Sequence, residues 1–241
     1  MLATPLYDVG GIKQKLNPGD LINTMEQTFA VVDAAAHTYP GHELARGEII
    51  RSGGAALADV LPTADGLIKA LIGSLYTSPA TAGFASYSTA LVSEFNPSLQ
   101  PIQAGSSFRR TWINNNTDVL TLTAPASSGI TIAGTATIPT VNWREFIIRI
   151  LNSTPTLLLI GTTANASKVL SNFNKDLINN ITPGMSVYGV GIGASAKVTA
   201  VNRDAGTISV DVNSTADADN IAITFTPTVV VTTLRGGTLN N

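Results

Sequence analysis

The chain has 241 residues, of which 44% are hydrophobic and only 12% are charged, and its net charge is −2. A nucleic-acid groove is therefore not expected, because it requires a basic patch that replaces the counterions of the phosphates. The absence of cysteine excludes a disulfide framework, a thiolate nucleophile and a cysteine-ligated zinc site.

The scarcity of charge is the most unusual property of the composition, because soluble domains usually contain roughly 25% charged residues. Interfaces are depleted of charge, so the composition predicts extensive contact between subunits. A secreted β-protein with a surface of Thr and Asn is the alternative interpretation. Residues 1–19 lack a basic region followed by an apolar run, so we expect no signal peptide. No apolar stretch is long enough for a transmembrane helix, and we expect no membrane partner.

The first segment, residues 1–105, is expected to be mixed and partly helical. Asn17 is a suitable N-cap, Pro18 suits the first helical position, and apolar residues follow at helical spacing, which predicts a helix near 18–35. The run 29–32 fits a strand equally well. A second helix is predicted over 63–75, with Thr63 as its cap and a stripe of Leu and Ile for the core. Residues 76–105 are rich in Ser, Ala, Pro and Gly and are expected to be extended or draped over a partner.

The second segment, residues 106–161, alternates as β-strands do. Together with contributions from 45–75 it forms the first predicted β-module, with Phe146, Ile148 and Ile150 on one face and with Trp112 and Trp143 anchoring the core or its rim. The five predicted strands cover residues 108–113, 119–123, 130–138, 144–151 and 156–160.

The third segment, residues 162–241, forms the second predicted β-module. A hairpin is predicted from arms at 197–202 and 207–212, with Gly206 in the turn where a positive φ is needed. Strands at 185–190, 221–225 and 229–234 are expected to complete a small sheet. The predicted fold class is therefore mainly β, with two small antiparallel β-sandwich or barrel-like modules preceded by a mixed, partly helical N-terminal segment.

Several patterns look catalytic but are better explained by structure. Residues 189–194 satisfy the glycine spacing G-x-G-x-x-A of a dinucleotide site, but the residues that follow alternate as a strand, whereas the fingerprint requires a helix. Asp217 and Asp219 have a metal-like spacing, yet a calcium loop needs more ligands, and a solvated turn is the preferred interpretation. His37 and His42 lack a third zinc ligand.

No G-x-S-x-G elbow and no distinguished pair of carboxylates is present. We therefore expect no enzyme activity, no catalytic residue, no cofactor and no metal.

Two sets of short stretches form recognisable patterns. The first set comprises residues 58–64 (ADVLPTA), 105–109 (GSSFR) with Ile113-Asn114, 129–135 (GITIAGT) and 143–146 (WREF). It resembles a β-module of virion structural proteins of tailed bacteriophages. The second set comprises residues 183–192 (PGMSVYGVGI), a Val-rich hairpin and 223–225 (ITF), and it resembles a small β-unit of phage surface and fibre proteins. The insertion 75–104 departs from the first pattern.

The resemblance implies a capsid decoration protein, a head fibre or a tail-associated component of the virion, often trimeric. The leading hypothesis is a non-enzymatic decoration or cement protein that is made in the host cytoplasm and binds the major capsid protein or another virion component. Its N-terminal segment, including Tyr7, Phe29 and Tyr39, is expected to dock on the shell or on a sister subunit. A homotrimer is favoured, while a dimer or a ring would fit the low charge equally well.

Two alternative functions are compatible with the same sequence. The first is a receptor- or glycan-binding fibre or tail component, in which Trp112, Trp143 and Tyr188 stack on sugars. The second is a tailspike-type glycan depolymerase, which would require a converging pair of carboxylates.

Overall fold

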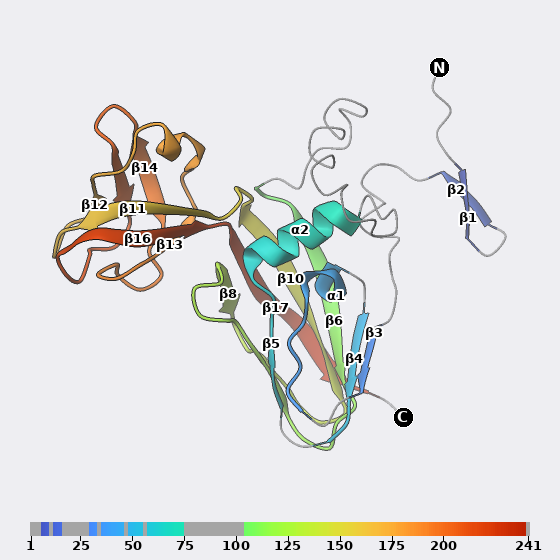
Figure 1. Cartoon of the computed structure of the whole chain (residues 1–241). Helices are drawn as coiled ribbons and strands as arrows, with labels where there is room; N and C mark the ends of the chain where they lie inside the picture. Colours follow the sequence, from blue (N-terminus) through green and yellow to red (C-terminus); the bar gives the residue numbers. More distant parts are fainter. Residues whose placement is uncertain are drawn as a thin grey trace.

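The computed structural model describes residues 6–9, 12–15, 29–32, 35–45, 48–54, 57–74 and 104–239 (Figure 1). It confirms that the fold is mainly β. The helices and strands are, in chain order, β1 (Leu6–Val9), β2 (Ile12–Lys15), β3 (Phe29–Val32), α1 (Gly41–Ala45), β4 (Glu48–Ser52), β5 (Leu57–Val60), α2 (Ala64–Ser74), β6 (Ser107–Asn114), β7 (Leu120–Thr123), β8 (Ile130–Ala133), β9 (Thr137–Ile138), β10 (Asn142–Asn152), β11 (Leu157–Thr163), β12 (Val169–Leu170), the 3-10 helix η2 (Leu177–Asn180), β13 (Ser186–Tyr188), β14 (Val198–Asn202), β15 (Thr207–Val210), β16 (Ala218–Thr226) and β17 (Thr228–Thr238).

The first module is built on a six-stranded sheet with the strand order β3-β4-β6-β10-β17-β8. The alternation predicted for β10 is confirmed, because Phe146, Ile148 and Ile150 are all fully buried. One hydrophobic core joins the inner face of this sheet to α2 and to a second sheet, β5-β7-β9. The sheets are mixed rather than antiparallel, since β3–β4, β4–β6, β17–β8 and β5–β7 are parallel pairs.

The second module is a small antiparallel β-barrel. Its two three-stranded sheets, β11-β16-β13 and β12-β15-β14, are joined by bridges between Thr162 and Ser171 and between Ser186 and Lys197. The six strands therefore follow one another around a closed ring. The barrel has its own hydrophobic core, which includes Phe173, Phe225 and the fully buried Ile223.

The boundaries of the modules differ from those predicted. The predicted division between residues 161 and 162 assigned β11 to the first module and β17 to the second. In the structure β11 belongs to the barrel, whereas β17 returns to the six-stranded sheet and pairs with β10 over its length. The barrel is thus an insertion between β10 and β17, and in Figure 1 it stands to one side of the first module. The reason is packing, because Val229 and Val231 of β17 are fully buried in the first core.

The two predicted helices have different outcomes. The second is confirmed as α2, and its predicted cap is present, since the amide of Gly66 donates to the Thr63 hydroxyl over 3.0 Å. The helix near 18–35 is wrong over 29–32, where the chain forms β3 parallel to β4. Val31 is buried and Val32 is 77% exposed, which is the two-residue period of a strand. Residues 16–28 lie outside the described part of the chain.

Local predictions in the β-region are largely confirmed. The hairpin forms from β14 and β15, and Gly206 has a φ of 65° as its turn requires. The single strand predicted over 130–138 is divided by Gly134, whose φ is 90°, into β8 and β9, which belong to different sheets. Most of the predicted segment 76–105 lies outside the described residues.

Candidate functional site

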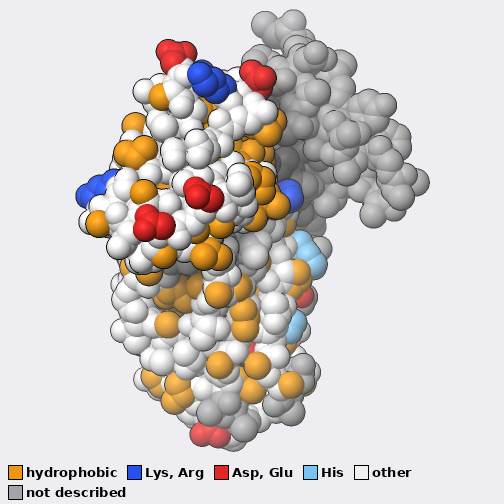
Figure 2. All heavy atoms as spheres, turned by 60° about the vertical axis from the view of Figure 1, so that its left-hand side comes forward, with side chains coloured by type: hydrophobic (Ala, Val, Ile, Leu, Met, Phe, Trp, Pro, Cys, Tyr) orange, Lys and Arg blue, Asp and Glu red, His pale blue; other side chains and the backbone are white. Residues whose placement is uncertain are grey.

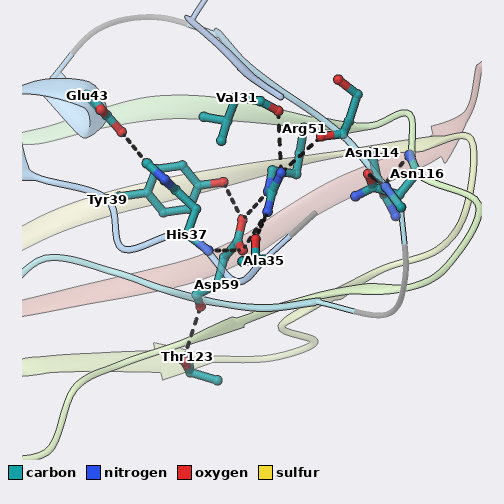
Figure 3. Close-up of polar contacts among 12 residues, drawn as sticks. Val31, Ala35, His37, Tyr39, Glu43, Arg51, Asp59, Asn114, Asn116 and Thr123 are labelled. Atoms are coloured by element: carbon teal, nitrogen blue, oxygen red, sulfur yellow. Dashed lines mark hydrogen bonds and ion pairs between the residues drawn. The ribbon is translucent and has the colours of Figure 1, made fainter. Parts of the chain in front are cut away.

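The most concentrated polar chemistry of the described chain is a cluster around Asp59 (Figure 3). β5 places Asp59 on the same face as the buried Leu57, and β4 places Arg51 on the same face as Ile49. Both charged side chains are therefore directed into the core, and both are completely buried.

Arg51 and Asp59 form an ion pair with an Nε–Oδ2 distance of 2.9 Å. The remaining donors of Arg51 reach backbone carbonyls, since Nη1 donates to Ser52 over 3.0 Å and Nη2 donates to Ala35. A buried ion pair is tolerated only when such additional hydrogen bonds satisfy its other atoms. The guanidinium thus links β4 to the segment that precedes α1.

Asp59 is the centre of the cluster because both of its carboxylate oxygens accept several donors. The Tyr39 hydroxyl donates to Oδ2 and the amide of His37 donates to Oδ1, each over 2.8 Å. The backbone carbonyl of Asp59 accepts the Thr123 hydroxyl over 3.0 Å. Burial raises the pKa of Tyr39 far above its ordinary value, and the neighbouring Asp59 carboxylate raises it further. Tyr39 therefore remains a proton donor rather than a phenolate.

His37 extends the cluster toward the surface. Its Nε2 lies 2.8 Å from Oε2 of Glu43 in α1, and the side chain is 23% exposed. Its ring and that of Tyr39 are in a T-shaped contact, with ring centroids 4.7 Å apart. His37 is the accessible rim of a cluster whose centre is enclosed, and its partner Glu43 is buried.

The enclosed centre cannot contact a substrate, because Tyr39, Arg51 and Asp59 have no exposed surface. Its hydrogen bonds instead connect four separate parts of the chain, namely residues 35–39, β4, β5 and β7. We interpret the Asp59 cluster as a structural element that holds the segment between β3 and α1 against the two sheets.

Arg110 is a second buried cation, and it binds helix α1. Its Nε donates to the carbonyl of Leu44 over 2.5 Å and its Nη2 to that of Ala45 over 2.6 Å. Burial lowers the pKa of Arg110 to about 10. Its guanidinium also lies 4.5 Å from the centroid of the Phe108 ring. The carbonyls at the C-terminal end of a helix carry partial negative charge, so Arg110 anchors this end of α1 to β6.

Of the three residues predicted to dock on a partner, Tyr39 is the one whose side chain the structure describes. Tyr7 lies on β1 and Phe29 on β3, and their side chains are outside the described structure. The prediction for Tyr39 needs correction, because its ring is fully buried and its hydroxyl is bound to Asp59.

The three residues predicted to stack on sugars also have different environments. Trp112 is fully buried against Phe146, with ring centroids 5.2 Å apart, so the glycan-stacking prediction is wrong for this residue. Trp143 and Tyr188 are half-buried. The Arg235 guanidinium lies 5.8 Å from the centroid of the Trp143 ring, and Gly237 faces the same ring from the neighbouring strand.

Tyr188 belongs to the joint between the modules. Its hydroxyl accepts the amide of Gly129 from the first module over 3.1 Å. At the other side of the joint, Asn152 at the end of β10 donates to the Thr182 hydroxyl over 2.9 Å and to the carbonyl of Pro183 over 3.0 Å. Ser186 and Thr228 are joined by a buried hydroxyl–hydroxyl contact of 2.8 Å. The barrel is therefore held by side-chain contacts as well as by its two connecting strands.

The two sequence patterns in the barrel that resemble ligand sites, residues 189–194 and the loop of Asp217, serve the fold of the barrel. Residues 189–194 are followed by strand β14 and not by a helix, so the arrangement that a dinucleotide fingerprint requires does not form. One carboxylate oxygen of Asp217 accepts the amide of Asn165 over 2.8 Å. Within the described ranges, no group of three or more His, Asp or Glu side chains is arranged to hold a metal ion.

A shallow, open groove of about 670 Å³ lies between residues 181–183 and 201–204 of the barrel. Its polar side chains already serve the local fold, since Asn202 accepts the amide of Ala205 and Arg203 donates to the carbonyl of Asn179. The groove therefore offers few free polar groups to a ligand.

The surface of the barrel is richer in aliphatic side chains than in charge (Figure 2). Leu158 and Ile160 of β11 are 65% and 54% exposed, and Val190 is 69% exposed. Leu158 is opposite Thr224, and Ile160 is opposite Ala222 on β16, so this part of the outer face contains no charge. Leu158 and Ile160 are two positions apart on one strand and therefore share this outer face.

A different surface lies on the outer face of the six-stranded sheet. Glu145 of β10 binds Arg235 of β17, with an Oε2–Nε distance of 2.6 Å, and approaches Arg109 of β6, with an Oε1–Nη1 distance of 3.6 Å. The Glu145 side chain is only 9% exposed, whereas the two arginine side chains are 65% and 63% exposed. The arginines thus cover the carboxylate and direct much of their own surface to solvent.

Sequence reasoning missed the Asp59 cluster, Arg110 and the Glu145 ion pairs. A signal for the first was available, because Arg51 and Asp59 each lie two residues after an apolar residue of the same strand face. In a chain with so little charge, an ion at such a position indicates a buried pair. Nothing in the sequence indicates that the two ions bind each other.

No protein-family model matches the chain, and a comparison with curated proteins finds no match. Within the described part of the chain, no helix has the length and apolar character needed to cross a membrane.

Proposed function

We propose that this chain is a non-enzymatic virion structural protein of a tailed phage, acting as a capsid decoration or stabilising protein. The observation that carries the proposal is the architecture of the barrel. A closed module, inserted between β10 and β17 and hydrogen-bonded to the first module at the joint, projects from the first module. A projection of this kind suits a protein that is attached at one end and exposed at the other.

The other end of the molecule supports the same proposal. Strands β1 and β2 form a two-stranded sheet that pairs with no other described strand, and Figure 1 draws it on the side of the first module away from the barrel. An isolated hairpin is marginally stable in water. A hairpin of this kind gains stability by docking on a partner, which is the role proposed for the segment that contains Tyr7.

The surface chemistry also favours repeated packing. Only 12% of the residues are charged, and several of these ions are satisfied inside the first module, as in the Arg51–Asp59 pair. Neighbouring copies can then pack together without removing many ions from water. We propose a homotrimer that binds the major capsid protein or another component of the virion.

The test combines the mass of the chain in solution with its binding to shells. The mass is measured by light scattering over a dilution series, and the sample is then mixed with shells of the encoding phage from which accessory proteins have been stripped. We expect a stable trimer that cosediments with the shells. A monomer that remains in the supernatant would contradict the proposal.

A further inference from the structure

Three arginines lie on one face of the first module. Residues 108, 110, 112 and 114 of β6 are buried, so Arg109 is directed to the opposite, outer face of the sheet. On β10 the buried positions are 146, 148 and 150, which places Arg149 on the same outer face. Arg235 joins them from β17, where it is paired with Glu145. Three neighbouring strands therefore contribute one basic side chain each.

The charges on this face are not balanced. Glu145 faces Arg109 and Arg235, and Glu48 of β4 lies on the same outer face, opposite Thr111 of β6. Arg149 is exposed beside Ser107 and Val230. Arg109 and Arg149 occupy diagonal positions across the β6–β10 pair, where side chains of like charge are within reach of each other. Three arginines and two glutamates therefore give this face one net positive charge, on a chain whose net charge is −2.

Apolar residues lie between and beside these charges. On the outer face, Ile147 is opposite Arg109, and Trp143 is opposite Ile113. Ile147, Trp143 and Ile113 are half-buried, whereas Arg109 is exposed. Arginine and tryptophan are the residues most enriched at the energetically important positions of protein interfaces. On the face that Figure 2 shows, no Lys or Arg side chain is visible in the lower half of the molecule.

We propose that the outer face of β6, β10 and β17, around Arg109, Arg149 and Arg235, is a docking surface for a partner protein that presents carboxylates. The choice of an acidic partner follows from the excess of arginine over glutamate on this face and from the exposure of the Arg109 and Arg235 side chains. The choice of a protein follows from its shape, since the open face of a sheet matches an extended protein surface, whereas sugars are usually held in concave sites. This inference rests on the proposed function and identifies the surface of attachment.

The test uses the full chain and an immobilised poly-L-glutamate matrix at low ionic strength, with polygalacturonate as the polysaccharide probe. The test variant is the double substitution Arg109→Ala/Arg149→Ala. The fold should tolerate it, because the Arg109 side chain is largely exposed and its ion pair with Glu145 is long, at 3.6 Å. The matched control is Lys168→Ala/Lys175→Ala, which removes the same charge from exposed positions of the barrel. Thermal unfolding verifies that both variants remain folded.

We expect wild type to bind poly-L-glutamate, the test variant to bind about tenfold more weakly, and the control to change by less than about twofold. Equal losses in the two variants would reveal a general effect of charge and would overturn the proposal. Binding to polygalacturonate but not to poly-L-glutamate would overturn it in favour of an acidic glycan.

The same variants distinguish this inference from the proposed function. If wild type and the test variant cosediment equally with stripped shells, the docking surface is wrong while the decoration function stands. If wild type does not bind shells, the decoration function is wrong, and the poly-L-glutamate comparison still decides whether this face recognises carboxylates.

Discussion

Arg51 and Asp59 form an ion pair with an Nε–Oδ2 distance of 2.9 Å, and neither side chain has any exposed surface. The pair joins adjacent elements, β4 and β5, that belong to different sheets. Because Asp59 also accepts Tyr39 and the amide of His37, loss of its carboxylate would affect several groups together.

The Asp59→Ala substitution should destabilise the chain by about 3–5 kcal/mol, because it leaves the Arg51 cation buried without its partner. Denaturant unfolding followed by Trp fluorescence measures the change. Lys69→Ala is the control, since it removes the partner of Asp65 from a pair in which Lys69 is 71% exposed. We expect the control to cost less than about 1 kcal/mol. Similar values for the two substitutions would contradict the structural role of the cluster.

The stabilisation provided by Tyr39 should decrease in alkaline solution. Its pKa is raised in the folded state, so the unfolded chain loses this proton near pH 10 while the folded chain keeps it. The contribution of Tyr39 to the free energy of unfolding is then complete below pH 10 and falls by about 1.4 kcal/mol for each pH unit above it. The difference in stability between wild type and Tyr39→Phe should therefore shrink by about 1.4 kcal/mol between pH 9 and pH 11. A difference independent of pH would show that Tyr39 titrates normally.

Gly41 permits close contact between α1 and α2. A Cβ atom at this position would lie 2.2 Å from the carbonyl oxygen of Gly66, whereas a Cβ on Gly66 itself would meet only the Thr63 hydroxyl at 3.1 Å. Gly41→Ala should therefore destabilise the chain by about 1–3 kcal/mol. Gly66→Ala should change it by less than about 1 kcal/mol, since alanine favours the helix. Thermal unfolding of both variants decides the point, and equal effects would be inconsistent with the close approach.

The barrel should fold as an isolated fragment of residues 156–227. All members of its hydrophobic core lie within this range, and its strands form a closed ring. A fragment of residues 162–241 lacks most of β11, including the buried Leu159, and carries β17 without its partner β10. We expect cooperative thermal unfolding by circular dichroism for the first fragment and no cooperative transition for the second. The opposite result would restore the boundary predicted at residue 162.

The two tryptophans should respond differently to acrylamide. Trp112 is fully buried, whereas Trp143 is half-buried on the outer face of the sheet. Trp143→Phe should leave a protein whose fluorescence is weakly quenched, and Trp112→Phe should leave one that is quenched more strongly. Stern–Volmer slopes under native conditions measure the contrast. Equal slopes would mean that the outer face is covered in solution.

The sequence was sufficient to predict features that depend on near neighbours. Helix α2 and its Thr63 cap, the β14–β15 hairpin around Gly206 and the buried stripe of β10 are all as predicted. Each depends on periodicity or turn chemistry within a few residues. The mainly β fold class follows from the sum of such signals.

Tertiary structure alone decided which strands join which sheet and which polar groups meet. The alternation of buried and exposed residues in β17 would suit either module. Its place beside β10 depends on pairing with residues that lie 76 to 96 positions earlier in the chain. From the sequence alone, Tyr39 is predicted to lie on a docking surface. Tyr39 is instead buried, because its hydroxyl can donate a hydrogen bond to Asp59 inside the core. The hydrophobic pattern of a strand shows which of its sides is buried. It does not show which element packs against that side, because the stabilising contacts come from residues far away in the chain.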